Sequence, residues 1–471
     1  MSVLTSLARL RAVQEGIAQP VTTVRHCHVA ERPMVFIPLK LSGEAAAPLA
    51  AMLGDDRDHP HLLVVAQPRN RDLRFAFTAE LAGVLLPYVQ SFIGDTETVE
   101  RKNADPYERA LDAPQLLVPN RTGVAFTQLL GRSTRFRRAD GPYPVDPSVP
   151  VLGRWLTYFA DKAAYPGSSL MLAATAELAA HWASGQSSLE DANLAALVGW
   201  ITSGPTPEAE DPSVWPPAGP VTDPGFDADV LAPAIDRGDP ERLAAVLRTQ
   251  LEPTWELMWR AADLLRALPA GASVERRWEH DRASYSAMTE DGPPQPRRDG
   301  AVGAASRLTR MERAQASYDV QRAYDDPLVM AEYRLTGEAF AGTVVETDPE
   351  HAEGEGRSRK LRPLVVVKSD DPVRLAPGTS LGTPQRRGQG AELVSAEDGL
   401  ITLKITKGMG RGKTPVEGAV PEVGERVCYT SLTDDFQGAP ALPEREATPW
   451  THGGPPEEYV PRDEDAVEEW S

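Results

Sequence analysis

The spacing of apolar and polar positions predicts a mixed α/β unit over residues 1–149. Residues 3–16 repeat a leucine or valine every three positions, which is typical of a short amphipathic helix. Beyond them, β-branched or apolar runs alternate with helix-length segments. We expect strands at 21–24, 34–41, 61–66, 73–77, 115–118 and 124–130, and helices at 42–53 and 80–92. This order indicates a small sheet with helices packed against it.

The middle of the chain has helical patterns on both sides of a proline-rich segment. Residues 150–202 contain helix-length segments at 152–164, 169–183 and 189–201, and form a predicted helical subdomain. Residues 203–226 hold seven prolines, which predicts a linker and a domain boundary. Residues 227–340 form a stalk-like helical region with segments at 240–251, 254–268, 273–288 and 301–324. Pro253 should separate the first two of these, because it has no amide hydrogen.

After residue 341 the pattern changes to short β-rich runs between glycine and proline turns. Strands are expected at 343–346, 364–368, 391–395, 400–406 and 426–429, and strands this short predict a small β-barrel over residues 341–432. Residues 433–471 are acidic, rich in proline and aperiodic, which is typical of a disordered tail. The predicted fold class is α+β and multidomain: an N-terminal mixed α/β unit, a central helical region, and a C-terminal β-barrel followed by the tail.

Composition narrows the class of protein. At roughly 150 residues per domain, 471 residues suggest about three domains, and a hydrophobic content of 41% can supply their cores. Cys27 and Cys428 indicate no disulfide framework. The sequence offers neither a long apolar run nor a signal peptide, so we expect a cytoplasmic protein with no membrane partner. Nothing in the sequence calls for a cofactor.

Charge is distributed unevenly along the chain. The net charge of -19 disfavours non-specific binding of nucleic acid by the whole molecule. Residues 357–415, however, hold twelve lysines and arginines against five acids, whereas residues 416–471 hold three against fourteen. A basic barrel is therefore followed by an acidic tail. The barrel can neutralise phosphates, or the tail can fold back on it and cancel its charge.

If the barrel neutralises phosphates, its lysines and arginines are the candidate binding residues for nucleic acid or an acidic partner. They are Arg357, Arg359, Lys360, Arg362, Lys368, Arg386, Arg387, Lys404, Lys407, Arg411 and Lys413. Residues 357–415 are nearly devoid of aromatic side chains, which argues against a platform for stacking single-stranded bases.

Two further patterns suggest chemistry but do not establish it. His26 with His28, and His59 with His61, form two H-x-H pairs that together could offer four imidazoles to zinc, although no known spacing links them. The run GMGRGKT at 408–414 resembles a phosphate-binding loop, but Lys407 stands where the first glycine is required and Pro415 follows, so no helix can begin there. We interpret it as a basic turn, and we predict no metal site.

Residues 254–432 resemble the helical stalk and β-barrel accessory domain of superfamily-one helicases. The resemblance lies in a helical region followed by RPLVVVKSDDPVRLAPGTSL, DGLITLKITKGMGRGKTP and VPEVGERVCYTSL. In such helicases the barrel touches the nucleic-acid backbone beside the motor. This chain has no motor motifs, so the resemblance implies an accessory protein that works with a separate ATPase.

These observations favour a non-enzymatic adaptor that places a basic barrel against nucleic acid or a helicase-like ATPase partner. Two alternatives stay open. One is an enzyme with its site in the N-terminal α/β unit, perhaps metal-dependent through the histidine pairs. The other is a structural subunit of a larger assembly. The adaptor hypothesis depends on the barrel cations not being matched already with carboxylates.

Overall fold

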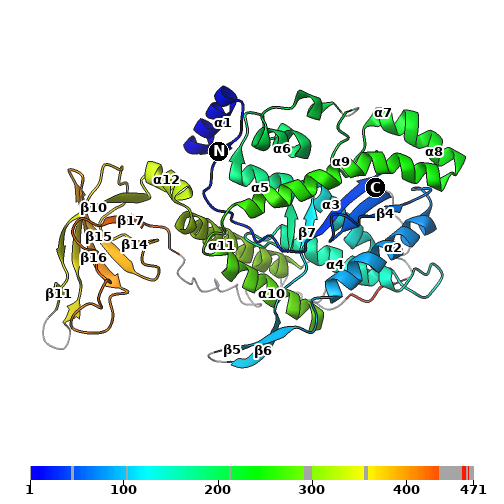
Figure 1. Ribbon diagram of the computed structural model, residues 1–471. Helices are drawn as coiled ribbons and strands as arrows, with labels where there is room; N and C mark the ends of the chain where they lie inside the picture. The colour runs from blue at the N-terminus through cyan, green and yellow to red at the C-terminus, as the bar shows by residue number, and fades with distance from the viewer. Residues whose placement is uncertain are drawn as a thin grey trace. The chain divides into compact units, whose positions relative to one another are not determined.

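The computed structural model describes residues 2–43, 47–101, 104–211, 214–290, 297, 300–354, 359–433, 459–462 and 465. They divide into two compact units. The larger unit takes in Thr5–Val21, Arg25–Ala314 and the described residues after 441. The smaller unit takes in the described residues from Gln315 to 433, together with Thr22–Val24 and the residues before Thr5. Figure 1 shows the elements of both.

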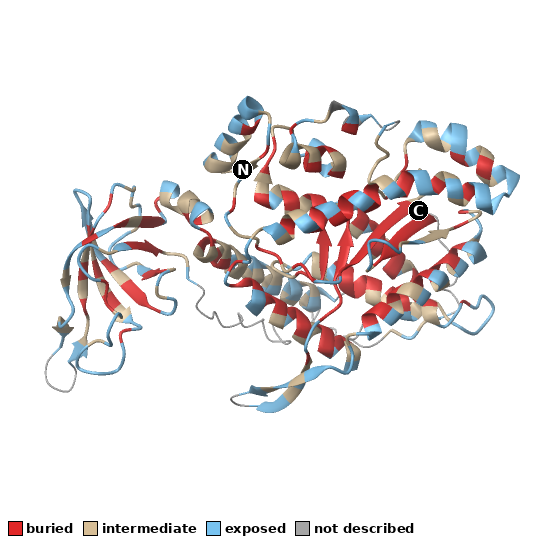
Figure 2. Cartoon of the chain, viewed as in Figure 1, coloured by how far each residue is buried: buried red, intermediate tan, exposed pale blue. Residues whose placement is uncertain are grey.

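The larger unit is built on a five-stranded mixed sheet with the strand order β4-β3-β2-β7-β8. Strands β2, β7 and β8 run parallel to one another, and β3 and β4 extend the sheet in antiparallel fashion. The strands are β2 (Met34–Lys40), β3 (Pro48–Gly54), β4 (His61–Val64), β7 (Leu116–Val118) and β8 (Met171–Ala173). Strands β2, β3, β7 and β8 are buried almost throughout, because helices cover both faces of the sheet (Figure 2).

Alternate residues of the sheet belong to two separate hydrophobic cores. Phe36 and Leu53 lie in one core, whereas Ile37 and Met52 lie in the other. The first core is completed by α2 (Arg71–Gln90), α3 (Arg121–Thr134), α4 (Ser148–Ala163) and α10 (Val274–Glu290). The second is completed by α5 (Ala174–His181), α6 (Leu194–Thr202), α8 (Ala232–Arg237) and α9 (Pro240–Ala267). The result is a three-layer α/β/α arrangement.

The remaining elements of the larger unit are short or peripheral. They are α1 (Val3–Glu15), which begins in the smaller unit, β1 (Gln19–Pro20), β5 (Thr96–Arg101), β6 (Ala104–Ala110), β9 (Trp182–Ala183), α7 (Pro224–Phe226), the 3-10 turns Glu190–Ala192 and Pro207–Glu210, and the π-turn Asp227–Leu231. Strands β5 and β6 form a two-stranded ribbon of mostly exposed residues. In α1 the leucine stripe is half exposed and only Ala12 is buried.

The structure divides the chain differently from the sequence-based expectation. Residues 150–202, expected to be a helical subdomain, supply strand β8 to the same sheet. The proline-rich segment at 203–226 is no boundary, because Trp215 packs on the core and Lys40 N donates to Pro220 O. Helices α9 and α10, expected in a separate stalk, cover the two faces of the sheet. Tertiary packing of apolar faces therefore outweighs the local proline content, which predicts a linker.

Several predicted elements were wrong for related reasons. Residues 48–54 form strand β3 rather than a helix, because both faces of the strand are buried and alanine fits that space. The segments at 73–77 and 124–130 belong to helices α2 and α3, each started by an asparagine cap, Asn70 and Asn120. Residues 21–24 are loop. Pro253 lies inside the continuous helix α9, whose buried face includes Leu251 and Trp255.

The smaller unit contains the predicted barrel. Strands in the order β10-β13-β16-β15-β14-β17 close on one another, with a core that includes Phe340, Leu403 and Tyr429. They are β10 (Ala339–Asp348), β13 (Leu364–Lys368), β14 (Ser380–Gly382), β15 (Gly390–Glu397), β16 (Leu400–Lys407) and β17 (Arg426–Thr430), preceded by α11 (Ala301–Asp325) and α12 (Pro327–Thr336). The five predicted strands are confirmed, whereas β14 was missed because it is only three residues long. Among the described residues, no helix has the length and hydropathy of a bilayer span.

Candidate polyanion-binding surface

Two loops extend from one end of the barrel, and each carries two exposed cations among the described residues. The first joins β10 to β13 and contains a small hairpin, β11 (Ala352–Glu353) and β12 (Lys360–Leu361). The second leaves β16 after Lys407 and leads to β17. Arg362 joins the loops at their base, since its guanidinium donates to Thr406 O at 3.3 Å. Figure 1 shows both loops at the same end of the barrel.

Four cations on these loops have no carboxylate partner within the described part of the chain. Arg359 and Lys360 lie on the hairpin, and Arg411 and Lys413 lie on the loop after β16. All four are exposed, and no ion pair or hydrogen bond of their side chains is present among the described residues. We call them the loop cations. Each can contact a polyanion without first breaking an ion pair.

Three of the predicted cations are already paired. Arg386 binds both carboxylate oxygens of Glu425 at 2.8 Å, and Arg387 pairs with Asp325. Lys404 lies 3.2 Å from Glu353 and Glu392, and these hydrogen bonds raise its pKa. The hydrogen bond to Glu425 likewise raises the pKa of Arg386. These side chains hold the barrel together, and they have less capacity to bind a ligand than an unpaired cation has.

The other predicted cations do not form one surface with the loops. Lys368 ends β13 opposite Leu400, which is the far end of β16 from Lys407. Arg362 is half-buried and donates to backbone carbonyl groups. Lys407 is exposed at the base of the second loop and packs across Gly390. Arg357 lies outside the described residues.

The GMGRGKT segment forms a turn rather than the start of a helix. Gly408 and Gly410 have φ of 87° and 93°, values that favour glycine, and Val416 N donates to Met409 O across the turn. Met409 is buried and anchors the loop in the barrel core. The segment therefore displays Arg411 and Lys413 to solvent, in agreement with the interpretation as a basic turn.

The two histidine pairs are not brought together. His61 begins β4 at one edge of the sheet, whereas His28 N donates to Ser169 Oγ beside β8 at the other edge. Four strand spacings, or about 19 Å, separate those edges. His59 is exposed and binds Asp56 at 2.7 Å. Within the described residues, no cluster of three or more His, Cys, Asp or Glu side chains is arranged to hold a metal. The metal-dependent alternative therefore loses its proposed ligands.

Sequence reasoning missed a buried polar cluster in the larger unit. Ser168 Oγ and Ser169 N donate to Asp281 at 2.8 and 2.7 Å, and Arg277 donates to His26 O at 2.7 Å. His26 N in turn donates to His181 Nε2 at 3.0 Å. These bonds join the segment before β2 to β8, α5 and α10. We call this set the polar hub and interpret it as structural.

Burial shifts the titration of the hub and of its neighbours. The pKa of Asp281 rises to about 6, and the pKa of His28, which stacks on Trp278, falls to about 4. Burial and the nearby Glu177 raise the pKa of the Cys27 thiol. Cys27 is therefore a protonated core residue and a poor nucleophile. Burial also raises the pKa of Cys428, to about 11.

Comparison with known proteins found no matching family model, no matching curated protein and no matching solved structure.

Proposed function

We propose that this protein is a non-enzymatic accessory protein that binds the backbone of double-stranded nucleic acid through the loop cations. The observation that carries the proposal is the position of Arg359, Lys360, Arg411 and Lys413 on two adjoining loops, exposed and without carboxylate partners among the described residues. When unpaired cations neutralise phosphates, counterions condensed on the nucleic acid are released, and this release favours binding. A residue such as Arg386, which is already paired with a carboxylate, contributes less to the binding free energy.

The absence of aromatic residues favours contacts with the nucleic-acid backbone over contacts with the bases. Residues 357–415 contain no Phe, Trp or Tyr. The aromatic side chains of the barrel strands, Phe340 and Tyr429, are buried in the barrel core. Proteins that hold single strands usually stack bases on aromatic rings. A surface of this kind therefore favours a duplex, recognised through its phosphates and with little sequence preference.

The resemblance to helicase barrel domains suggests a separate ATPase as the second partner. In that arrangement the barrel holds the duplex while the motor is supplied by another chain. Affinity purification of the tagged full chain from its native cells tests this: recovery of an ATPase after nuclease treatment supports a direct contact. Loss of the ATPase on nuclease treatment limits the proposal to nucleic acid alone.

The test of the central proposal is fluorescence anisotropy of a labelled 20-base-pair duplex titrated with the full chain. Four phosphate contacts predict a slope of log affinity against log salt of about −3 to −4, and a loss of affinity of about 100-fold between 50 and 200 mM salt. Arg359→Ala, Lys360→Ala, Arg411→Ala and Lys413→Ala combined should reduce the slope toward zero.

The matched control is Lys368→Ala, because Lys368 is an exposed barrel cation at the opposite end of β13. It should leave the affinity within about threefold of the wild type. A wild-type chain that does not bind the duplex at 50 mM salt contradicts the proposal. Equal binding by the fourfold variant contradicts it as well.

A further inference from the structure

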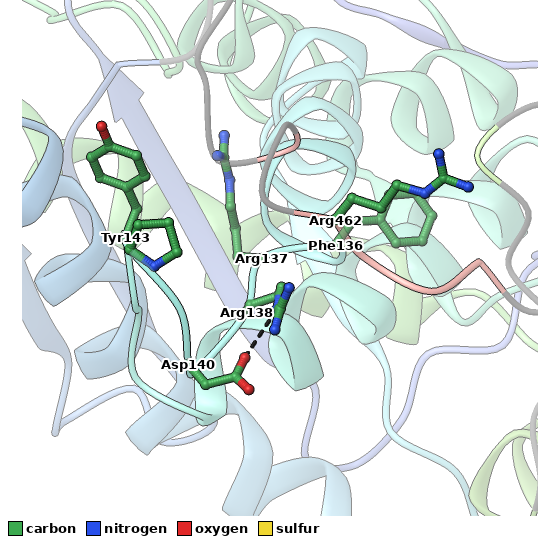
Figure 3. A pocket seen from close by; sticks show the side chains of 7 residues that line it. Phe136, Arg137, Arg138, Asp140, Tyr143 and Arg462 are labelled. Carbon is green, nitrogen blue, oxygen red and sulfur yellow. Dashed lines mark hydrogen bonds and ion pairs between the residues drawn. The ribbon is translucent and has the colours of Figure 1, made fainter.

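A second basic surface lies in the larger unit, in the loop that follows α3. The loop brings Arg135, Arg137 and Arg138 together with Phe136, and Tyr143 lies farther along it. Arg71, at the start of α2, donates to Tyr143 O at 3.0 Å and lies over the ring of Phe75. Seven residues line a small cleft (Figure 3): Phe136, Arg137, Arg138, Asp140, Pro142, Tyr143 and Arg462. We call it the arginine cleft.

The acidic C-terminal segment already occupies one side of this cleft. The ring of Tyr459 meets the ring of Phe136 edge-on at 4.7 Å, and Arg137 donates to Asp465 O at 2.6 Å. The distribution of charge along the chain leaves open whether this segment covers the barrel. Its described residues, 459–462 and 465, contact the arginine cleft instead. We call them the strap.

Asp465 holds the strap in shape. Its carboxylate accepts from Tyr459 OH at 2.8 Å and from Arg462 N at 2.7 Å, and it pairs with Arg297 at 2.9 Å. The side chain is only 7% exposed. Although burial opposes ionisation, these donors and the nearby arginines keep the pKa of Asp465 below its usual value. The strap is therefore a built contact between an acidic turn and an arginine-rich surface.

We propose that the arginine cleft is a docking site for an acidic, tyrosine-containing peptide segment of a partner protein, and that the strap occupies it in cis until the partner displaces it. The chemistry of the contact favours a peptide over a nucleic acid. Arg137 binds a peptide carbonyl, and Tyr459 meets Phe136 by its edge rather than stacking flat.

The strap is joined to the barrel by residues 434–458, so its docking is an intramolecular event at an effective concentration of order millimolar. A partner segment must compete with that concentration. This inference is independent of the duplex-binding proposal, which concerns the barrel.

In the test, a labelled peptide of residues 455–471 is titrated with the full chain. Binding is measured by fluorescence anisotropy at 150 mM salt. Tyr459→Ala with Asp465→Ala releases the strap, so the peptide should bind this double variant at least about tenfold more tightly than the wild type. Adding Arg137→Ala or, separately, Phe136→Ala should remove that gain. Phe136 is only half-buried, so its variant keeps the proposal testable if Arg137→Ala unfolds.

The matched control is Arg132→Ala, since Arg132 is an exposed arginine in the last turn of α3 that does not line the cleft. It should retain the tenfold gain. The proposal fails if the double variant does not bind the peptide or if Arg132→Ala abolishes binding. It also fails if a scrambled peptide of the same composition binds equally well. Tighter binding of a labelled oligonucleotide than of the peptide, lost with Arg137→Ala, assigns the cleft to nucleic acid instead and overturns the proposal.

Discussion

The buried interior of the larger unit and the two barrel loops use charged side chains in opposite ways. In the larger unit, Arg277, Arg282 and Asp281 are buried and bind groups from distant parts of the chain. On the barrel, Arg411 and Lys413 stand on a loop with no partner in the described structure. A buried charge must be satisfied by the protein itself, so it fixes the fold. An exposed charge contributes little to folding and is available for binding. Position in the fold, rather than residue type, therefore separates structural from functional charges.

The largest effect on stability at a fixed, neutral pH is expected from removing a buried arginine. Arg282 is 10% exposed and donates to Leu111 O at 2.8 Å and to Glu97 at 3.2 Å. Arg282→Ala removes a donor to Leu111 O and one of the donors to Glu97, which keeps Arg109 at 2.8 Å. It should lower the free energy of unfolding by about 2 kcal/mol, because hydrogen bonds to charged groups are worth about 1.5–3 kcal/mol. Denaturant unfolding measures this. The control is Arg242→Ala, because Arg242 is an exposed arginine on α9 of the same unit. An equal loss in both variants would remove the distinction between buried and exposed charges.

The next effect is a pH dependence of the free energy of unfolding. It becomes visible only when Asp281 or His28 is substituted alone. The folded pKa of Asp281, about 6, exceeds its unfolded value, so its contribution to stability falls as pH rises from about 4 to 6. The folded pKa of His28, about 4, lies below its unfolded value, so its contribution rises over nearly the same window. In the wild type the pH-dependent contributions of Asp281 and His28 to stability should largely cancel. Each shift of about two units corresponds to about 2–3 kcal/mol.

Substitutions that remove one group should expose the other. Asp281→Asn should become more stable as pH rises from 4 to 6.5, because His28 titrates alone. His28→Gln should become less stable as pH rises from 4 to 6. Chemical denaturation at half-unit pH intervals checks both slopes. Parallel profiles for the two variants would show that the shifts do not arise in the folded hub.

The smallest effect on stability is expected on the barrel. Arg411→Ala with Lys413→Ala should change the free energy of unfolding by less than about 0.5 kcal/mol, because exposed charges away from ion pairs contribute little. The same variant should weaken duplex binding and lower the salt slope by about 2. Thermal melting beside anisotropy measures the two quantities. A clear loss of stability would mean that these side chains support the loop rather than serve a ligand.

The barrel was predictable because its strands are encoded locally. In residues 400–406, apolar and polar positions alternate, and glycine or proline bounds each of the other short strands, so pattern and turn chemistry agree. The charge excess over residues 357–415 was also visible. The pattern did not show which cations are unpaired, because the partners lie far away in the sequence. Glu425, Asp325 and Glu353 pair with Arg386, Arg387 and Lys404 across 39 to 62 residues.

The sequence by itself determined the barrel strands, most of the helices and the segregation of charge, since these depend on neighbours within a few positions. Only the tertiary structure decided that β8 joins the N-terminal sheet, that α9 continues through Pro253, and that the acidic C-terminal segment lies on the arginine cleft. Each of those outcomes depends on contacts between residues far apart in the chain. Burial of apolar faces and satisfaction of charge there outweigh the local preference of the backbone.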